Sequence, residues 1–513
     1  MRDKRIAVLV SFCIFLISYG LLNAHEAKAK PPGTLVVASG ETMHTFDHYY
    51  NNRRDGLNAA HQIFDYPLYR DPKTMKIVPG LCESWRYIDD KTLELRIRKG
   101  VKFTNGEPVN AEAFKFTFEF MIHPESKIAT RQNIAWLDKV RIVDDLTVRL
   151  IMKAPYAPAL QQLANSMPVY PPKYFKEVGR DQFGMKPVGS GPYKLVSWKR
   201  GAEYVLEANP DYFDRGKNKP KIKKVIIREI PELATQINEL ISGGIDLIQL
   251  LPSDQAETIK KNKHLKLQTT PILRIWFVQM DGQGRSSPNS PFAKLKVRQA
   301  VNHAIDRQGI VDNILGGFGK VITSACNPLH FGCETNVKTY PYDPKLAKKL
   351  LAEAGYPKGF STDFYGYRDK QTVEAVMGYL EAVGIKATLK WFGGQYATFD
   401  KYQRVQGIVP IAVNAWGSYS VFDCSSCTST WFANKGGYNY NERPELMAWL
   451  KEADGIVDEA KRKELYSKAL KYIAENAFWV PLYSGVMINA MDARLDYEVA
   501  ADENARYFTA SWK

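Results

Sequence analysis

LCESWRYIDDKTLELRIRKGVKFTNGEPVNAEAFKF, residues 81–116, predicts a strand followed closely by a helix. Residues 93–98 alternate apolar and polar side chains with a period of two, which indicates a half-buried strand that ends at Lys99-Gly100. From residue 111 to residue 121 the apolar side chains recur at helical spacing, and Asn110 is a suitable N-cap. Both periodicities therefore occur in one short stretch, which favours a mixed α/β fold.

The same alternation of strands and helices continues along the chain. Flanking glycines and N-cap residues mark the ends of several of these elements. Strands are expected at residues 34–38, 225–227 and 385–391, and helices at residues 233–241, 343–354 (with Asp343 as N-cap and Gly355 after the end) and 372–383.

The composition is that of a globular protein. The chain has 513 residues, of which 45% are hydrophobic and 24% charged, and this length predicts about three domains. The formal net charge is +15, but the basic residues are spread out, and their densest cluster, residues 217–224, lies between Asp214 and Glu229. No basic tail or aromatic stacking motif accompanies that cluster, so we expect no nucleic-acid partner.

The first 29 residues have the parts of a secretory signal peptide. Residues 2–5 carry three positive charges, residues 6–22 are almost all apolar, and Ala27-Lys28-Ala29 offers a small-x-small cleavage site. We expect cleavage and export, which would leave a net charge of +13; an uncleaved membrane anchor is the alternative. Cys13 lies inside the apolar run rather than after a cleavage site, so no lipobox is seen.

Five cysteines lie beyond residue 29: Cys82, Cys326, Cys333, Cys424 and Cys427. In an oxidising compartment we expect the last four to form two disulfides, for which three connectivities are possible. We favour the short loops Cys326–Cys333 and Cys424–Cys427. A four-cysteine zinc site is the alternative, although Cys326 and Cys333 lack the usual CxxC spacing. Cys82 is expected to be a buried small hydrophobe.

The sequence carries no recognisable catalytic motif. It lacks the G-x-S-x-G nucleophile elbow, H-E-x-x-H and G-x-x-x-x-G-K-[ST]. His44 and His48 are four residues apart beside Asp47, which would suit a metal on a helix, but their surroundings predict a loop. We therefore expect a binding protein without a cofactor or resident metal; a secreted hydrolase is the rival class.

Several stretches resemble the bacterial extracellular solute-binding proteins of family 5, the substrate receptors of peptide and nickel ABC importers. Residues 81–116 resemble the signature of that family. Further matches follow in the family's order: VGSGPY at 188–193, NPDYF at 209–213, GGID at 243–246, PFAKLKVRQAVNHAIDRQGIVDNI at 291–314, YDPKLAKKLLAEAGYPKG at 342–359 and VGI at 383–385. The resemblance covers roughly residues 33–490.

The resemblance implies a two-lobed periplasmic-binding-protein fold of the large type, with a third domain inserted in the first lobe. Lobe one would comprise about residues 30–70, 180–272 and 487–513, the inserted domain residues 71–179, and lobe two residues 273–486. Two crossing strands, near residues 271–280 and 483–489, would form the hinge. Ligand would be buried between the lobes.

The resemblance also implies a function. It indicates a periplasmic receptor, expected to be a monomer, that captures a peptide or peptide-like solute and delivers it to a membrane-embedded ABC permease with its ATPase subunits. An opine, a sugar or a nickel chelate remains an alternative ligand. A periplasmic chaperone that holds peptides in the same groove is an alternative role.

In peptide-binding relatives, a W-x-x-D stretch of lobe two anchors the ligand's amine. The matching stretch is Trp416-Gly417-Ser418-Tyr419, with tyrosine in place of the aspartate. A buried ammonium group needs a paired anion. Either Asp423 supplies it, or no free amine binds there and Tyr419 contacts a neutral ligand. We expect Trp416 to form an aromatic wall of the pocket.

The remaining candidate ligand contacts lie where predicted strands end. Arg368 lies where relatives carry a group for the ligand carboxylate, and its planar guanidinium would suit that role; a solvated loop arginine is the alternative. The candidate walls are Trp276, Met280, Thr42, Met43 and Phe46. Arg298 and Arg307, on the helical stretch of residues 291–314, are expected to make structural ion pairs.

Overall fold

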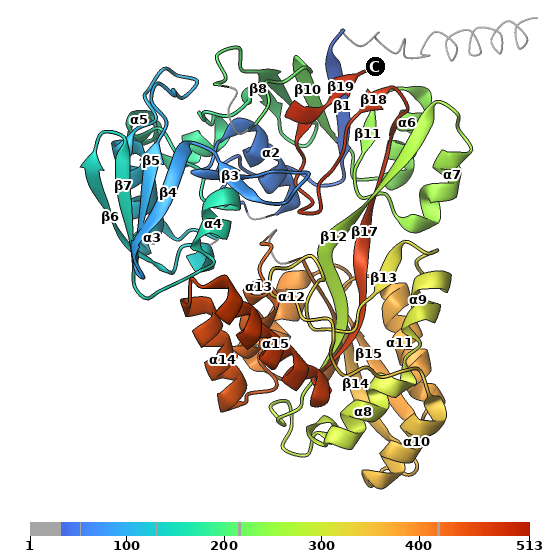
Figure 1. Ribbon diagram of the computed structural model, residues 1–513. Helices are drawn as coiled ribbons and strands as arrows, with labels where there is room; N and C mark the ends of the chain where they lie inside the picture. Colours follow the sequence, from blue (N-terminus) through green and yellow to red (C-terminus); the bar gives the residue numbers. More distant parts are fainter. Residues whose placement is uncertain (1–31, 52, 130, 214–216, 418–420) are drawn as a thin grey trace, which may run out of the picture.

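The protein was analysed as a computed structural model that describes residues 32–51, 53–129, 131–213, 217–417 and 421–513. The expected signal peptide and the candidate residues Ser418 and Tyr419 lie outside these ranges. Figure 1 shows two bodies joined by a pair of long strands, with the inserted domain beside the upper one. Across the described ranges, no helix is both long enough and apolar enough to span a membrane.

A sheet of eleven strands runs through the described residues of both lobes, in the order β15-β14-β16-β12-β17-β11-β1-β10-β9-β8, with β13 paired to β17. Its strands are β1 (Thr34–Ser39), β8 (Tyr193–Lys199), β9 (Glu203–Ala208), β10 (Lys224–Glu229), β11 (Leu247–Ile248), β12 (Leu265–Met280), β13 (Gly319–Val321), β14 (Phe360–Gly366), β15 (Ile385–Trp391), β16 (Ile411–Trp416) and β17 (Trp479–Asp492). The strands predicted at 34–38, 225–227 and 385–391 are thereby confirmed as β1, β10 and β15.

The inserted domain is built on an antiparallel sheet of four strands, ordered β4-β5-β7-β6. These are β4 (Cys82–Asp89), β5 (Thr92–Ile97), β6 (Leu137–Asp144) and β7 (Thr147–Met152), and the short pairs β2 (Leu68–Arg70) with β3 (Ile77–Pro79) and β18 (Leu495–Asp496) with β19 (Ser511–Trp512) lie outside it. One continuous apolar core contains both Leu35 of β1 and Leu93 of β5. The inserted domain therefore shares its core with lobe one.

The described α-helices cover the faces of these sheets. They are α2 (Arg54–Ile63), α3 (Ala111–Ile122), α4 (Ala159–Asn165), α5 (Pro172–Met185), α6 (Leu233–Ser242), α7 (Ala256–Lys260), α8 (Leu295–Ala304), α9 (Arg307–Asn313), α10 (Pro344–Glu353), α11 (Lys370–Ala382), α12 (Tyr396–Asp400), α13 (Ser425–Phe432), α14 (Pro444–Gly455) and α15 (Glu459–Glu475). In lobe two, α8 to α11 lie on one side of the long strands and α13 to α15 on the other (Figure 1).

Local capping fixes the helix starts that the sequence predicted. The Asn110 side chain accepts a hydrogen bond from the Ala113 backbone N–H at 3.1 Å, and α3 begins at the next residue. Asp343 accepts one from the Leu346 N–H at 2.9 Å before α10. Gly355 follows α10 with a φ of 89°, a conformation that glycine adopts without strain. These boundaries depend on neighbouring residues alone.

The long strands β12 and β17 pair antiparallel from Leu265 opposite Asp492 to Gln279 opposite Trp479. The register shifts between Pro271 and Ile275 and again between Trp276 and Phe277. β12 begins earlier than the sequence suggested, because residues 265–270 mix polar and apolar side chains and fall outside the apolar run. β17 extends beyond the predicted residues 483–489 at both ends. The irregular register gives the pair a place to bend.

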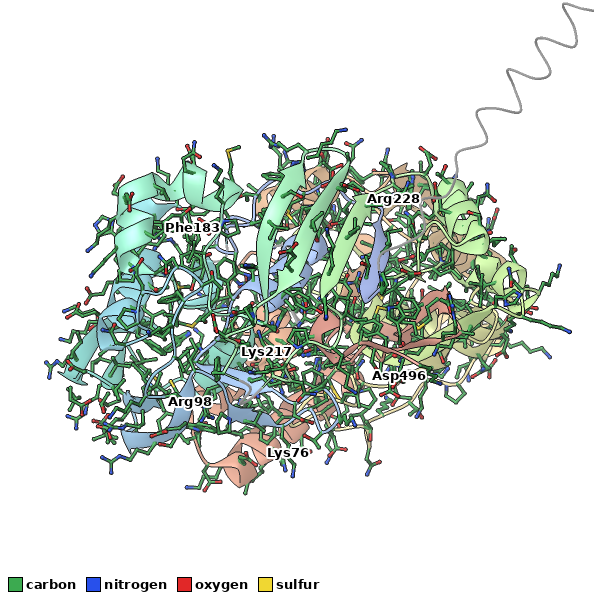
Figure 2. All side chains as sticks on the ribbon, turned by 90° about the horizontal axis from the view of Figure 1, so that it is seen from above. Lys76, Arg98, Phe183, Lys217, Arg228 and Asp496 are labelled. Carbon is green, nitrogen blue, oxygen red and sulfur yellow. A yellow bond between two sulfur atoms is a disulfide. The ribbon has the colours of Figure 1, made fainter. Side chains whose placement is uncertain are left out.

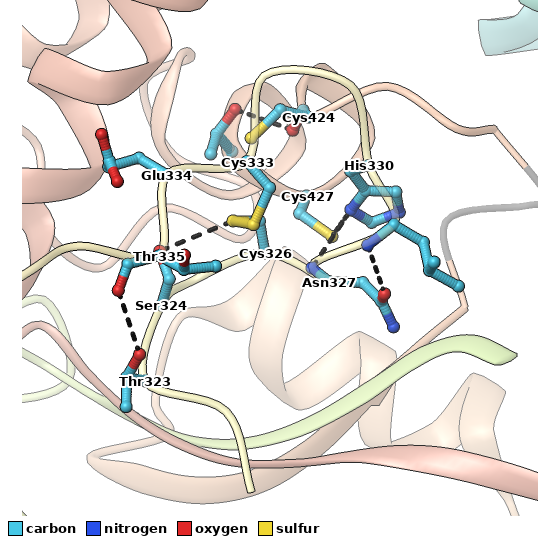
Figure 3. The surroundings of a disulfide bond; sticks show 12 residues. Thr323, Ser324, Cys326, Asn327, His330, Cys333, Glu334, Thr335, Cys424 and Cys427 are labelled. Atoms are coloured by element: carbon cyan, nitrogen blue, oxygen red, sulfur yellow. Dashed lines mark hydrogen bonds between the residues drawn. A yellow bond between two sulfur atoms is a disulfide. The ribbon is translucent and has the colours of Figure 1, made fainter. Parts of the chain in front are cut away.

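The disulfide expectation is half confirmed. Cys326 and Cys333 are bonded, with their Cα atoms 5.8 Å apart, so the four-cysteine zinc site is wrong. The expected Cys424–Cys427 bond is also wrong: both cysteines are buried outside any disulfide, and the Cys427 Sγ lies 3.7 Å from Nδ1 of His330 (Figure 3). Cys424 immediately precedes α13 and Cys427 lies in its first turn, where its sulfur faces the His330 ring rather than Cys424.

Charged side chains of both signs are mixed around the outline of the molecule (Figure 2). The densest basic cluster is nevertheless not a wholly solvated surface. Lys217, labelled in Figure 2, is only 4% exposed, and its Nζ lies 3.0 Å from Oδ1 of Asp65. Arg298 and Arg307 also differ from expectation: their guanidinium groups donate to backbone carbonyls, those of Asn476 and Pro481 among them, rather than to carboxylates.

Candidate ligand-binding site

Parallel strands in each lobe end at one edge of the sheet. In lobe one, β10 and β11 both pair parallel with β1; in lobe two, β15 and β16 both pair parallel with β14. Ligands of open α/β sheets bind outside the carboxyl ends of such strands. The segments that leave these ends, residues 39–42 in lobe one and residues 367–369 and 416–417 in lobe two, therefore mark the candidate site.

A cluster of charged residues lies between these segments, beside the hinge. Arg274, in the middle of β12, places Nη2 at 2.9 Å from Oε2 of Glu503, and Nη2 of Arg54 lies 3.6 Å from the same oxygen. A Cβ added to Gly417 would lie 3.5 Å from both Arg274 Nη2 and Glu503 Oε1. The end of β16 in lobe two thus lies near Glu503 of lobe one, with little room for a side chain at Gly417.

Glu503 is ionised because of these arginines. Burial alone would raise the pKa of Glu503, but Arg274, Arg54 and Arg368 outweigh it and hold that pKa below its usual value. Glu503 also has a positive φ of 63°, a strained conformation for a non-glycine residue. Asp369 lies beside Arg368, 3.3 Å from its Nε. A guanidinium group that reaches solvent, such as that of Arg368, can bind a ligand carboxylate.

Trp276 is held rigidly at the edge of this cluster. Its indole N–H donates to Oδ2 of Asp369 at 2.7 Å, and its ring stacks on Tyr483 at 4.9 Å. A Cβ on Gly485 would lie 2.5 Å from the Trp276 ring, so glycine is required there. Arg368 is largely exposed, with its Nε 3.3 Å from the same Asp369 oxygen. Trp276 and Arg368 are thereby brought together.

A cavity of about 680 Å³ opens between lobe two and the inserted domain. Its walls carry hydroxyl, amide and aromatic groups together with four charged side chains. They are Ala129, Asn133, Tyr156 and Gln162 of the inserted domain, and Tyr396, Asp400, Arg404, Trp416, Val421, Ser425, Ser426, Ser429, Thr430, Ala433, Asn434, Tyr438, Lys451 and Asp454 of lobe two. The size and the mixed lining are those of a pocket for a small polar solute.

Trp416 connects this cavity to the charged cluster. Its indole N–H donates to the Ser426 carbonyl at 2.8 Å, and Trp431 packs against it edge to face at 5.6 Å. These contacts fix the ring with one part of its surface in the cavity wall. A Cβ on the adjacent Gly417 would meet Arg274 and Glu503 at 3.5 Å, so one strand end lies near both the cavity and the charged cluster.

Other contacts join lobe two to the rest of the chain. The Ala157 backbone N–H of the inserted domain donates at 2.8 Å to the carbonyl of Asp454, a residue of the cavity wall. The guanidinium group of Arg70 lies 4.6 Å from the centre of the Phe422 ring, a cation–π contact.

Asp423 is committed to a structural ion pair. Arg462 Nη2 lies 2.8 and 3.0 Å from its two carboxylate oxygens, and the Tyr466 hydroxyl donates to Oδ1 at 3.2 Å. Asp423 is only 1% exposed. Reorienting it toward a ligand would leave Arg462 buried without a counter-ion, so we do not retain Asp423 as the amine anchor.

Three of the candidate walls lie in apolar cores. Met280 is fully buried in the core of lobe two. Met43 belongs to the core of lobe one, where Phe46 packs between Trp198 and Tyr204. We leave Met43, Phe46 and Met280 out of the proposed site. Thr42 is half-buried on the segment that leaves β1 and stays a candidate.

His44 and His48 lie in different environments. His44 is exposed, whereas His48 is buried and its Nε2 lies 3.2 Å from the Ser166 carbonyl. Burial lowers the pKa of His48 to about 4, so this ring is neutral at physiological pH. The two residues lie in the turn region after β1, as the sequence predicted.

Sequence reasoning missed Arg54, Arg274 and Glu503. Arg274 carried a usable signal, because it is the one charged residue in the apolar run PILRIWFVQM. Glu503 carried none: its partner Arg274 is 229 residues away in sequence. Such long-range pairing follows from the chain passing twice between the lobes.

Comparison with known proteins agrees with the family resemblance of the sequence. The family model described as bacterial extracellular solute-binding proteins, family 5 (middle), matches residues 76–439. The glutathione-binding protein GsiB of Pectobacterium atrosepticum is 27% identical over 482 residues, which cover 90% of each chain. The solved structure of the ABC transporter substrate-binding protein CtaP from Listeria monocytogenes has a TM-score of 0.83 at 22% identity, and covers 94% of this chain and 100% of that one.

A second solved structure is that of the periplasmic binding protein DppA from Helicobacter pylori in complex with the peptide STSA. It has a TM-score of 0.78 at 23% identity, and the match covers 93% of this chain and 98% of that one. The two structures show that the fold is the two-lobed periplasmic-binding-protein fold, as expected from the sequence.

Proposed function

The chain belongs to the bacterial extracellular solute-binding proteins of family 5, and on that premise we propose that it is the receptor of an ABC importer. It captures a peptide or peptide-like solute between its lobes and delivers it to a membrane permease with ATPase subunits. It acts in the periplasm as a monomer after removal of residues 1–29, and it carries out no chemistry on the solute. The glutathione-binding and peptide-bound relatives support this ligand class.

The observation that carries the proposal is the cavity of about 680 Å³, whose walls come from two parts of the chain. A cavity shared in this way exists in full only when the two parts approach each other. A solute that contacts both walls therefore favours the closed arrangement over the open one, in proportion to its difference in affinity for the two. The hydroxyl, amide and aromatic groups of the lining suit a peptide backbone.

Lobe boundaries near residues 70, 180, 272 and 487 are part of the proposal. The irregular register of β12 between Pro271 and Ile275 supports a hinge at that point, because a strand pair bends most easily where its ladder is interrupted. Closure about this hinge would bring Trp416 and Gly417 toward residues 39–42 and Glu503. Within the site we retain Trp416, Gly417, Arg368, Trp276 and Thr42. Ser418 and Tyr419 remain proposed contacts on sequence grounds.

The arginines beside the hinge provide the second part of the site. Arg274 and Arg368 would hold the carboxylate of the solute, since a guanidinium group matches its two oxygens. Glu503 keeps Arg274 in place through its 2.9 Å ion pair. The importer would thus select solutes that carry at least one carboxylate.

Thermal unfolding of the mature protein with tripeptide libraries and with glutathione tests the proposal. A bound solute should raise the midpoint with increasing concentration, because binding to the folded state alone stabilises it. Trp416→Ala should lose most of that rise, whereas Trp449→Ala, on α14 against Tyr472 and Lys468, should keep it. Product analysis of the same mixtures provides the contrast with a hydrolase. Turnover of any library peptide, or no rise with any of them, would overturn the proposal.

A further inference from the structure

Lobe one contains a second cavity, of about 280 Å³, at the carboxyl ends of its parallel strands. It is distinct from the cavity beside Trp416 and shares none of its lining residues. Ser39 and Glu41 reach it from the segment after β1, Arg54 and Asp55 from the start of α2, and Gln249 from the segment after β11.

Two carboxyl groups line this cavity and share one cationic neighbour, Arg53. Asp55 is 7% exposed, and within the described ranges neither of its carboxylate oxygens has a hydrogen-bond partner. The same holds for the buried Oε2 of Glu41. The nearest cation is Arg53, whose Nε lies 3.7 Å from Asp55 Oδ1 and 3.5 Å from Glu41 Oε2. The Arg53 side chain is half exposed, so water weakens its attraction to the two carboxyl groups.

The two carboxyl groups also act on each other. Burial, and then the neighbouring Glu41, raise the pKa of Asp55 to about 7. Without a cation the pair therefore retains a proton in much of the population near neutral pH. A buried carboxylate without a partner is unfavourable, and the group that would satisfy it is a compact cation with several N–H donors.

Positive charge lies directly beside this acidic pair. Arg54 lines the same cavity and lies 3.6 Å from Glu503, which pairs with Arg274. The site therefore has an acidic end in lobe one and a basic end at the hinge. A zwitterion with separated charges would complement both ends at once, whereas a simple anion or a neutral sugar would leave Asp55 and Glu41 unsatisfied.

We propose that Glu41 and Asp55 bind the ammonium group of a zwitterionic peptide, while its carboxylate is held by the arginines at the hinge. This rests on the proposed function and deepens it by naming the charge pattern of the solute. The amine anchor then belongs to lobe one, which accounts for the tyrosine at position 419, where peptide-binding relatives have an aspartate. Binding displaces the proton that Glu41 and Asp55 share.

Paired peptide libraries test this proposal. Mature protein is incubated with an equimolar library of random tripeptides and with the same library N-acetylated, and the captured peptides are quantified by native mass spectrometry. The parent should capture the free-amine library about tenfold or more in preference to the acetylated one. Asp55→Asn and Glu41→Gln should remove that preference, since each deletes one charge with little change of shape. Glu257→Gln, an exposed carboxylate of α7, should leave it unchanged.

Thermal unfolding without ligand separates binding from a structural role. Asp55→Asn should be at least as stable as the parent, because the desolvation of this buried carboxylate outweighs its 3.7 Å contact with the half-exposed Arg53. A clear loss of stability would assign Asp55 to the structure and overturn the proposal. Equal capture of both libraries by the parent would overturn this proposal alone. Capture of neither would overturn the peptide assignment and this proposal together.

Discussion

Asp423→Asn should destabilise lobe two without weakening ligand binding. Asp423 accepts two hydrogen bonds from Arg462 Nη2, at 2.8 and 3.0 Å, and one each from the Tyr466 hydroxyl and the Ser425 N–H. The substitution leaves the Arg462 guanidinium buried without its counter-ion. Removing one partner of a buried ion pair costs about 3–5 kcal/mol.

Urea unfolding followed by tryptophan fluorescence measures this loss. With a slope of about 3 kcal/mol per molar urea, the midpoint should fall by roughly 1–1.7 M. Asp458→Asn, which changes the exposed N-cap of the neighbouring helix α15, should cost about 1 kcal/mol or less. The double change Asp423→Asn with Arg462→Met should recover part of the stability, because no unpaired charge is left buried.

Direct binding of the ligand by Asp423 would give a different result. In that case Asp423→Asn would leave the urea midpoint near that of the parent and weaken peptide capture tenfold or more. We expect the reverse: a lowered midpoint, with the affinity of the folded protein within about twofold of the parent. Measuring both quantities on one preparation distinguishes the two outcomes.

Three further predictions follow from buried groups. Gly485→Ala should lower the free energy of unfolding by about 1–3 kcal/mol in urea, because the added Cβ would lie 2.5 Å from the Trp276 ring. Gly378→Ala, on α11, should not lower it, because a Cβ there meets no atom within 4 Å. Equal stabilities for the two variants would contradict the packing argument. When the protein is unfolded without reductant and alkylated, mass spectrometry should find three modified cysteines, Cys82, Cys424 and Cys427. If only one cysteine is modified, a second disulfide is present and the prediction is wrong. The free energy of unfolding should fall by roughly 1 kcal/mol between about pH 6.5 and pH 8, which urea titrations at each pH would check. Burial raises the pKa of Asp47, Asp55 and Asp454 to about 7, so the folded state keeps protons that the unfolded chain releases, and this stabilisation is lost as the pH rises through 7. Burial lowers the pKa of His48, His61 and His330, which act in the opposite direction, mainly below pH 6.5; stability that rises above pH 6.5 would contradict the prediction.

Features that depend on neighbouring residues were predictable from the sequence. The starts of α3 and α10 follow from Asn110 and Asp343, whose side chains cap the helices that follow them. The short disulfide Cys326–Cys333 was also within reach, because its partners are seven residues apart. In each case the deciding interaction lies within one turn or one loop.

Features that depend on distant pairing were not predictable. Asp423 resembled a free carboxylate until the fold placed Arg462 beside it, 39 residues later. Cys424 and Cys427 were expected to form a disulfide, but the fold places His330, from a segment 97 residues earlier, beside the Cys427 sulfur. Glu41 and Asp55 were not singled out from the sequence, because only the three-dimensional structure shows that Asp55 is buried and that both residues line one cavity. The edge of the sheet at which we propose that ligand binds is thus easier to predict from the sequence than the side chains that hold the ligand.

Native mass spectrometry of the protein, freshly purified from cells that express the full chain, tests the central claim most directly. The account predicts a 1:1 complex with a non-covalently retained peptide-like solute that carries both a free amine and a carboxylate, and loss of that complex in Trp416→Ala but not in Trp449→Ala. A retained metal chelate, a retained neutral sugar, or a complex that survives Trp416→Ala unchanged would contradict it.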